Sequence, residues 1–233
     1  QNVNSYQDFT TPSTYSTGLA DGFSTMYKRA SGGTCFTELV DLVSRVNPEM
    51  RVRFTSPHPK DFPEDLLHLI ANRPNVCSSL HMPAQSGSSE MLRRMRRGYT
   101  RESYLSLIER AREIIPGVTV SSDFIVGFCG ETEQEFEETL SLVEEVRYDH
   151  AFLFAYSMRE KTNAHRNMKD DVPENVKKDR LRRIVELHYG LLGDKVKQCV
   201  GRRELVLVEG TSKRSSNRIV GRTCGNIKVV LDL

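Results

Sequence analysis

The hydrophobic positions between residues 37 and 156 follow two spacings in turn. Apolar residues recur every three or four positions within 37–46, 61–72, 100–115 and 132–146, which predicts amphipathic helices. Short apolar runs at 51–55, 76–82, 118–126 and 151–156 alternate with these helices and predict strands. Strand and helix alternating in this way indicate βαβ units and a parallel sheet, in either a doubly wound sheet or part of a βα barrel.

Threonines stand where three of these helices are expected to begin. Thr37, Thr100 and Thr132 can each accept a hydrogen bond from a backbone N–H group of the first helical turn. Glu135 follows Thr132 at the spacing of a capping box, which strengthens the prediction of a helix there.

The two ends of the chain differ from this central part. Residues 1–35 are rich in Ser, Thr, Asn and Gly without periodicity, so we expect a long irregular excursion. Beyond Pro173 one long helix should run to about Lys197, with His188 on its apolar side as a packing histidine. From Arg203 the period becomes two, which predicts the opening of a small antiparallel β module. We therefore expect a domain at 1–198, with an irregular insert at about 7–35, and a second domain at 199–233.

Composition indicates a globular chain without a membrane association. Of the 233 residues, 38% are hydrophobic and 27% are charged, and no apolar run is long enough to cross a bilayer. The five cysteines are far apart in sequence, so they form neither a disulfide framework nor a CxxC metal site. Reduced thiols are the simpler interpretation.

Basic residues are clumped although the formal net charge is only +2. Either a phosphate backbone or plain solvated helix faces would explain such clusters. The clusters comprise Arg93, Arg94, Arg96, Arg97 and Arg101; Lys177, Lys178, Arg180, Arg182 and Arg183; and Arg202, Arg203, Lys213, Arg214, Arg218 and Arg222.

Candidate chemistry lies in the loops that follow the predicted strands, because ligands meet parallel sheets at the carboxyl ends of their strands. In the segment from Asp123 to Thr132, Gly127 and Gly130 would let a ligand approach the backbone, and the next helix would offer unpaired N–H groups. A tight strand-to-helix turn explains the same glycines. Gln85 and Ser86 offer amide and hydroxyl groups suited to hydrogen bonding. His58 is a candidate acid or base in a third loop.

Six segments together carry a resemblance. They are Gln-Asn-Val-Asn-Ser-Tyr (1–6), Arg-Phe-Thr-Ser-Pro-His-Pro (53–59), Pro-Ala-Gln-Ser-Gly-Ser (83–88), Met-Arg-Arg-Gly-Tyr-Thr (95–100), Ser-Ser-Asp-Phe-Ile-Val-Gly-Phe-Cys-Gly-Glu-Thr (121–132) and Asp-Asp-Val-Pro-Glu (170–174). In this order they resemble the latter part of the MiaB-type tRNA methylthiotransferases, which are radical S-adenosylmethionine enzymes. Residues 205–214 resemble the start of the TRAM domain, the RNA-binding module of that family. Cys129, residues 156–162 and residues 22–28 are similar to the animal mitochondrial members.

The resemblance implies a fold and an activity. The fold is part of a radical SAM (βα) barrel followed by the start of a TRAM domain. The activity converts N6-isopentenyladenosine beside the tRNA anticodon into its 2-methylthio derivative, with S-adenosylmethionine and two [4Fe–4S] clusters as cofactors. The family's cluster cysteines lie upstream of the motif at 1–6, so we expect this chain to hold no metal and to be inactive alone.

The resemblance also implies site residues, partners and a location. Gln85, Ser86, Asp123, Gly127 and Gly130 are expected at the cofactor mouth, and no catalytic residue is assigned. The residues expected to contact tRNA are Arg93, Arg94, Arg96, Arg97, Lys213 and Arg214. The location would be mitochondrial, with a cytoplasmic pool as a further expectation, and a regulatory subunit of a cyclin-dependent kinase is a second expected partner. The alternative is a non-catalytic module that binds such a subunit or RNA.

Overall fold

The computed structural model describes residues 6–10, 15, 22–23, 33–55, 59 and 62–233. His58, most of the motif at 1–6 and most of the expected insert lie outside the described residues. The helices are α1 (Phe36–Val46), α2 (Glu64–Asn72), α3 (Ser89–Arg94), α4 (Arg101–Ile114), α5 (Glu133–Val146), α6 (Asn163–Asn167) and α7 (Glu174–Lys197). The strands are β1 (Gln7–Asp8), β2 (Thr34–Cys35), β3 (Ser79–His81), β4 (Thr119–Val126), β5 (His150–Ala155), β6 (Val206–Ser212), β7 (Ser215–Thr223) and β8 (Lys228–Asp232).

A parallel sheet with the order β3-β4-β5 forms the centre of the larger part of the molecule. The strand predicted at 51–55 is wrong: Val52 makes only a parallel bridge to Val76. The strand predicted at 76–82 is reduced to β3. The side chains of Arg51 and Arg53 donate to the backbone carbonyls of Arg222 and Thr223 in the C-terminal module, and the local pattern could not reveal these contacts.

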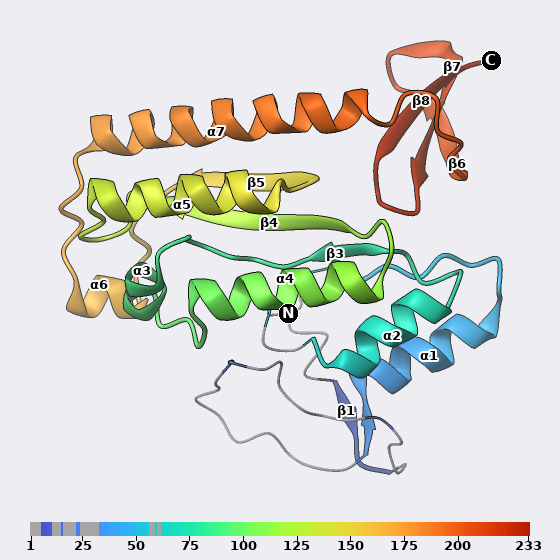
Figure 1. Ribbon diagram of the computed structural model, residues 1–233, viewed down its shortest axis with the longest axis horizontal. Coiled ribbons are helices and arrows are strands. Elements are labelled where there is room, and N and C mark those ends of the chain that lie inside the picture. Colours follow the sequence, from blue (N-terminus) through green and yellow to red (C-terminus); the bar gives the residue numbers. More distant parts are fainter. Residues whose placement is uncertain (1–5, 11–14, 16–21, 24–32, 56–58, 60–61) are drawn as a thin grey trace.

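One face of the sheet is buried under helices. Alternate residues of β4, namely Val120, Ser122, Phe124 and Val126, are fully buried. Helix α7 contacts β5 and α5, and Figure 1 shows α4, α5 and α7 running along the strands. Arg101 of α4 forms an ion pair with Glu145 of α5, which joins two of these helices. A parallel sheet flanked by its crossover helices is the architecture that the alternating pattern predicts.

Local sequence signals located most of the helix ends. The hydroxyl of Thr100 accepts from the N–H of Ser103, and Thr132 with Glu135 forms the predicted capping box. The cap predicted at Thr37 is wrong, because Cys35 precedes the first turn of α1 and Thr37 lies buried within the helix. Helix α3 was not predicted, since its six residues are too few for a periodic pattern.

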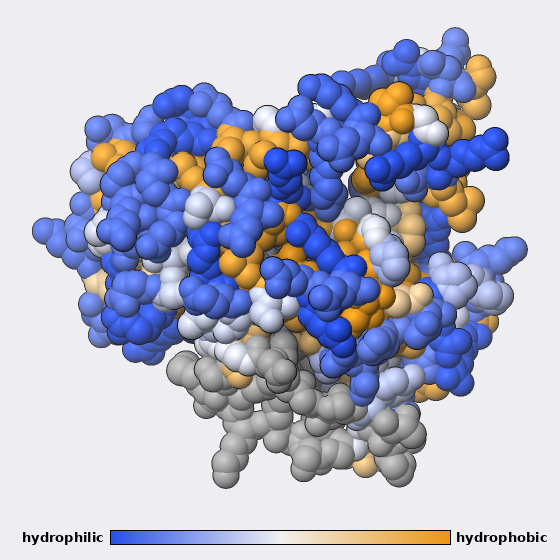
Figure 2. All heavy atoms as spheres, viewed as in Figure 1, coloured by the Kyte–Doolittle hydropathy of each residue, from blue (hydrophilic) through white to orange (hydrophobic). Residues whose placement is uncertain are grey.

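A small antiparallel sheet, β6-β7-β8, follows α7 as predicted. Helix α7 ends at Lys197 and β6 begins at Val206, so the architecture changes between them; the domain division at 198 and 199 stays a prediction. His188 is buried in the packing of α7 as predicted. Its Nδ1, however, has no hydrogen-bond partner among the described residues, so it is a packing histidine but not a fully satisfied one. Figure 2 shows hydrophobic residues on the surface of the β6–β8 module, where Leu207 and Val230 are exposed. Among the described residues, no helix has the length and apolar character to cross a membrane.

Candidate functional site

The face of the sheet opposite the helices is partly open, and we call it the inner face. His81, Ser121, Asp123, Phe152 and Phe154 lie on it, because residues that are paired across strands project to the same side. Phe152 and Phe154 are 44% and 52% exposed. Large apolar residues in a parallel sheet are usually buried, because helices cover both faces of such sheets. A partly exposed aromatic surface beside polar groups suits a ligand with a flat ring.

A hydrogen-bond chain fixes the polar part of the inner face. Nδ1 of His81 lies 2.9 Å from the hydroxyl of Ser121, and Nε2 lies 3.3 Å from Oδ2 of Asp123. The ring of His81 also meets that of Phe152 edge to face, with 5.8 Å between centroids. The Asp123 side chain remains 30% exposed, so its carboxylate is oriented but still accessible.

Gln85 and Ser86 lie where the line of β3 continues past its last residue. Gln85 bridges to Phe124 of β4 with a φ of +69°. Its N–H donates to the carbonyl of Asp123, which places the two residues side by side. The hydroxyl of Ser86 lies 3.1 Å from that of Thr139 on α5, so it faces the helices and not the inner face. Their roles in cofactor binding stay predictions.

The loop after β4 contains the two predicted glycines in left-handed backbone conformations, with φ values of +75° at Gly127 and +71° at Gly130. The N–H of Gly127 donates to Oε2 of Glu131 over 2.5 Å, and the N–H of Gly130 donates to Oδ1 of Asp171 over 2.7 Å. Carboxylates of the same chain thus occupy the N–H groups of both glycines, and the glycines' contact with a cofactor stays a prediction. The unpaired N–H groups expected at the start of the next helix also stay a prediction, although the Thr132 hydroxyl accepts from the N–H of Glu135 there.

The segment from Asp170 into α7 closes over this loop. Lys177 forms a salt bridge with Asp170 over 2.6 Å, and its side chain lies against Gly127. Arg180 forms a buried salt bridge of 2.9 Å with Glu131. Burial raises the pKa of Glu131, while Gly127 and Arg180 act in the opposite direction. The motifs at 121–132 and 170–174 thus form one structural unit. The salt bridge between Arg180 and Glu131 and the contact of Lys177 with Gly127 hold them together.

Most basic residues of the cluster on α7 form salt bridges with nearby carboxylates. Besides the two pairs above, Arg182 binds Asp179 and Glu186, and Arg183 binds Glu133 and Glu137. These contacts engage four of the five residues of this cluster within the protein. Two of the four, Lys177 and Arg180, are buried, so a solvated face describes only the rest of the cluster.

The predicted RNA-contacting residues fall into two groups. Arg94 is half-buried, pairs with Glu135 and donates to the carbonyl of Gly130, so it supports the glycine loop. Arg93 and Arg96 are exposed, and Arg97 is half-buried. Lys213 and Arg214 are exposed at the turn between β6 and β7. The structure brings α3 and the β6–β8 module to opposite ends of the molecule, so any RNA contact with both would span its length (Figure 1).

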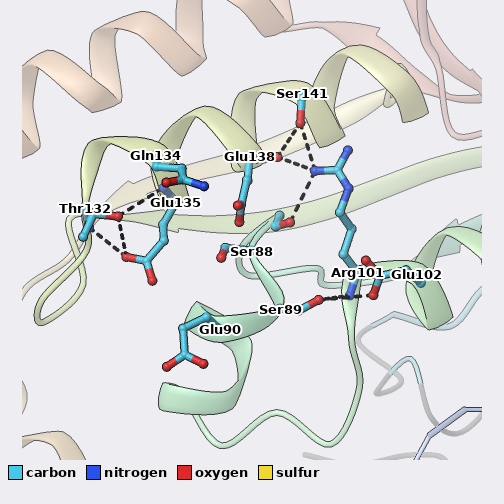
Figure 3. A pocket seen from close by; sticks show the side chains of 11 residues that line it. Ser88, Ser89, Glu90, Arg101, Glu102, Thr132, Gln134, Glu135, Glu138 and Ser141 are labelled. Atoms are coloured by element: carbon cyan, nitrogen blue, oxygen red, sulfur yellow. Dashed lines mark hydrogen bonds between the residues drawn. The ribbon is translucent and has the colours of Figure 1, made fainter.

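A polar depression of about 530 Å³ lies among α3 and the starts of α4 and α5 (Figure 3). Glu90, Glu102, Glu135 and Glu138 line it, with Arg101 as a basic neighbour. The excess of carboxylates disfavours phosphate groups there. It contains none of the residues predicted to bind the cofactor, so we do not place the site in it.

An iron–sulfur cluster does not fit the residues that the structure describes. Such clusters need several thiolate ligands at one place. Within the described ranges, no three His, Cys, Asp or Glu side chains converge as a metal site would require. The cysteines are Cys35, Cys77, Cys129, Cys199 and Cys224, all unbridged.

Sequence reasoning missed several residues of the site. The alternation of His150, Phe152 and Phe154 within β5 was a signal for an aromatic face, since side chains two apart share a side of a strand. His81 stood in a motif at a strand end, but its partner Asp123 belongs to another strand. Glu131 and Arg180 gave no signal, because the two lie far apart along the chain.

Comparison with known proteins adds three findings. The radical SAM superfamily model matches residues 20–143. The chain is 54% identical over 99% of its length to "Mitochondrial tRNA methylthiotransferase CDK5RAP1" from Homo sapiens. It is 46% identical over its full length to "tRNA-2-methylthio-N(6)-dimethylallyladenosine synthase" from Chlorobium limicola. It spans 39% and 48% of these two relatives.

The fold comparison agrees with the family match. Coproporphyrinogen III oxidase (HemN) from Escherichia coli, a radical SAM enzyme, superposes with a TM-score of 0.55. The alignment covers 84% of this chain and 55% of HemN at 18% identity, so it supports the fold alone. The predicted fold class, with a partial radical SAM barrel and a small antiparallel sheet, is confirmed. The radical SAM model matches more than half of the chain, and this match shows that the chain belongs to the radical SAM superfamily.

Proposed function

We propose that this chain forms the latter part of a tRNA methylthiotransferase that makes 2-methylthio-N6-isopentenyladenosine. The observation that carries the proposal is the similarity to two relatives with names for this activity, from a mammal and from a bacterium, over 99% and 100% of the chain. The comparisons offer no support for the alternative of a non-catalytic module.

S-adenosylmethionine and iron–sulfur chemistry belong to the proposal because the family name implies them. Asp123, Phe152 and Phe154 on the inner face fit a ligand that carries hydroxyl groups and a flat base, with the predicted residues Gln85, Gly127 and Gly130 at its rim. The cofactor supplies a sulfonium group, and its cleavage needs an electron that the described cysteines cannot relay. Two clusters per complete protein are part of the proposal.

Partners and location follow from the same relatives. A mitochondrial location is supported by the names of the human, mouse and rat relatives. We propose tRNA as the substrate, with contacts from Arg93, Arg96, Lys213 and Arg214, which the structure leaves exposed. A kinase regulatory subunit as a second partner and a cytoplasmic pool are predictions from the resemblance alone.

The test is made with a complete protein that joins this chain to a CxxxCxxC segment. Expressed in a bacterial strain without its own methylthiotransferase, this protein should restore 2-methylthio-N6-isopentenyladenosine in tRNA, measured by mass spectrometry of nucleosides. The matched control changes the three CxxxCxxC cysteines to Ala. A soluble, iron-loaded protein that cleaves S-adenosylmethionine but leaves tRNA unmodified would overturn the proposal.

A second experiment tests the inner face. In the complete protein, Asp123→Asn and Phe152→Ala should each weaken S-adenosylmethionine binding by about tenfold or more, with little change in melting temperature. Thr139→Val is the structural control, because Thr139 is buried on α5, away from the inner face, and is not among the residues predicted to bind the cofactor. If both inner-face variants keep the parent's affinity for S-adenosylmethionine, the inner face is not the cofactor site.

A further inference from the structure

Two cysteine side chains meet where the β6–β8 module contacts the parallel sheet. Cys77 lies just before β3 and is buried, whereas Cys224 follows β7 and is half-buried. Sγ of Cys224 lies 3.4 Å from the backbone nitrogen of Ser78, the residue bonded to Cys77, and both thiols are unbridged. They come from segments that are far apart in sequence, so the fold itself creates the pair.

Hydrogen bonds between the two parts hold this contact independently of the thiols. The guanidinium of Arg53 donates to the carbonyl of Thr223 over 2.5 Å. The hydroxyl of Thr119 on β4 donates to the carbonyl of Gly225 over 2.8 Å. A β-carbon at Gly225 would lie 2.6 Å from Cγ2 of Thr119, so the backbones approach closely there. Cys224 therefore lies between two anchored residues.

The surroundings of Cys224 favour its thiolate form. The N–H and the hydroxyl of Ser78 both donate to its Sγ, over 3.4 and 3.6 Å. The hydrogen bond from Cys77, then those from Ser78, with the nearby Arg51, lower the pKa of Cys224 to about 5. The hydrogen bond with Cys224 and burial raise the pKa of Cys77, which keeps its proton. Cys224 is thus the thiolate suited to attack peroxide. Once Cys224 is oxidised, its interaction with Cys77, the largest cause of the raised pKa of Cys77, is lost, and Cys77 can supply the second sulfur.

We propose that Cys77 and Cys224 are a site of reversible oxidative modification, at which hydrogen peroxide converts the two thiols into a disulfide. The Cys224 thiolate attacks one peroxide oxygen, the O–O bond breaks and hydroxide leaves, which forms a sulfenic acid. The Cys77 sulfur then displaces the hydroxyl group of that sulfenic acid, which leaves with the Cys77 proton as water. In sum, the thiolate and the thiol lose two electrons and one proton, and the peroxide becomes one water and one hydroxide.

This modification has a defined structural result. In the reduced chain, residues 198–205 are the covalent connection between α7 and the β6–β8 module. The disulfide adds a second connection, from the module to the residue before β3, and so fixes the module against the sheet. Two other cysteines lack this arrangement: burial raises the pKa of Cys129, and the Cys199 thiol donates to the carbonyl of Lys195.

The test treats the reduced 233-residue chain with hydrogen peroxide, blocks free thiols with N-ethylmaleimide and maps the peptides by mass spectrometry. We expect a Cys77–Cys224 crosslink that dithiothreitol reverses. Cys77→Ser and Cys224→Ser should each abolish it, and the matched control Cys199→Ser should retain it. In Cys77→Ser, dimedone should label the sulfenic acid on Cys224, whereas Cys77 should stay unlabelled in Cys224→Ser.

A second readout needs no variant. Limited trypsin cleavage after the exposed Arg202 or Arg203 should release the module from the reduced chain. From the peroxide-treated chain, the two pieces should stay together on a non-reducing gel and separate after reduction. The proposal is overturned if Cys129 or Cys199 reacts at lower peroxide than Cys224. A crosslink between other cysteines, or peroxide-treated pieces that separate without reduction, would overturn it as well.

Discussion

The side chain of Lys177 occupies the space that a β-carbon at Gly127 would need. A β-carbon there would lie 2.5 Å from Cγ of Lys177, and Gly127 has a φ of +75°. Asp170 fixes Lys177 through two hydrogen bonds of 2.6 and 2.7 Å. The protein's own packing thus requires a glycine at this position, whether or not a ligand also approaches it.

Gly127→Ala should therefore lower the free energy of unfolding by about 1–3 kcal/mol, through backbone strain and displacement of Lys177. Combined with Lys177→Ala, the loss should be smaller than the sum of the two single losses, because the obstacle is gone. Urea unfolding measures all three variants. Gly130→Ala is the control: its β-carbon would meet only the end of the flexible Arg94 side chain, at 2.8 Å, with a similar φ. Strict additivity would show that the contact is irrelevant.

The salt bridge between Arg180 and Glu131 should be sensitive to loss of one partner. The two side chains are 6% and 0% exposed, so Arg180→Leu would leave a buried carboxylate without its cation. We expect a loss of about 3–5 kcal/mol at pH 7, partly recovered by adding Glu131→Gln. Because burial raises the pKa of Glu131, the loss should shrink as the pH falls and the carboxyl group is protonated.

An exposed arginine on the same helix provides the comparison for that substitution. Arg182 pairs with Asp179 and Glu186 while remaining 59% exposed. Arg182→Leu should cost less than about 1 kcal/mol, as is usual for solvent-exposed pairs. Equal losses for Arg180→Leu and Arg182→Leu in urea unfolding would contradict the assignment of a buried ion pair.

The fold was predictable wherever its cause lies within one turn or one strand. The capping box of Thr132 and Glu135 and the long helix α7 are local patterns, and both were found from the sequence. The strand expected at 51–55 is reduced to one parallel bridge, between Val52 and Val76, and the Arg53 side chain donates to the carbonyl of Thr223, a partner 170 residues away. A local apolar alternation cannot show such a contact.

The candidate site was predictable only in part, for the same reason. Asp123, Gly127 and Gly130 stand in a recognisable strand-to-helix loop. What occupies that loop comes from elsewhere: Asp171 accepts from the N–H of Gly130, and Lys177 covers Gly127. A pairing between side chains of distant segments depends on how the chain folds, and so the sequence offered no spacing from which to infer it.

Stability should fall in mildly acidic solution because of His188. Burial lowers its pKa in the folded chain, with a further contribution from His150, while Asp149 acts in the opposite direction and Lys195 also lowers it. Below the ordinary histidine pKa of about 6.5, the unfolded chain binds a proton that the folded chain does not. The free energy of unfolding should therefore decrease as the pH falls from about 7.5 through 6.5 toward the lowered pKa.

His188→Leu removes this titration and provides the check. We measure the urea unfolding midpoints of the parent and the variant between about pH 7.5 and 5.5. The difference between the two midpoints should change with pH. The variant's stability relative to the parent should rise toward the acidic end. A constant difference across that window would mean that His188 does not take up a proton on unfolding there.

We expect no stable [4Fe–4S] cluster on this chain after anaerobic treatment with iron and sulfide. The described cysteines meet at most in a pair, Cys77 and Cys224, and no group of three metal-binding side chains converges among the described residues. After desalting, iron analysis measures the iron bound per chain, and the visible absorption spectrum detects any assembled cluster. About four irons per chain, bound stoichiometrically, would contradict the expectation.

RNA binding by this chain should depend on arginines that the fold leaves exposed. Arg93→Ala with Arg96→Ala should reduce the slope of log affinity against log salt by about 1–2, because two phosphate contacts are lost. Arg94→Ala should instead lower thermal stability, since Arg94 binds Glu135 and the carbonyl of Gly130.

The control for these variants is Arg182→Ala, which removes an exposed arginine that forms two salt bridges, whereas Arg93 forms one, with Glu90. Fluorescence anisotropy with a labelled tRNA, titrated at four or more salt concentrations, measures every slope, and melting curves exclude unfolding as the cause. If the Arg93→Ala, Arg96→Ala chain keeps the parent's slope, the exposed arginines of α3 are a solvated helix face. If Arg182→Ala flattens the slope equally, the effect reflects net charge and not a defined contact with the phosphate backbone.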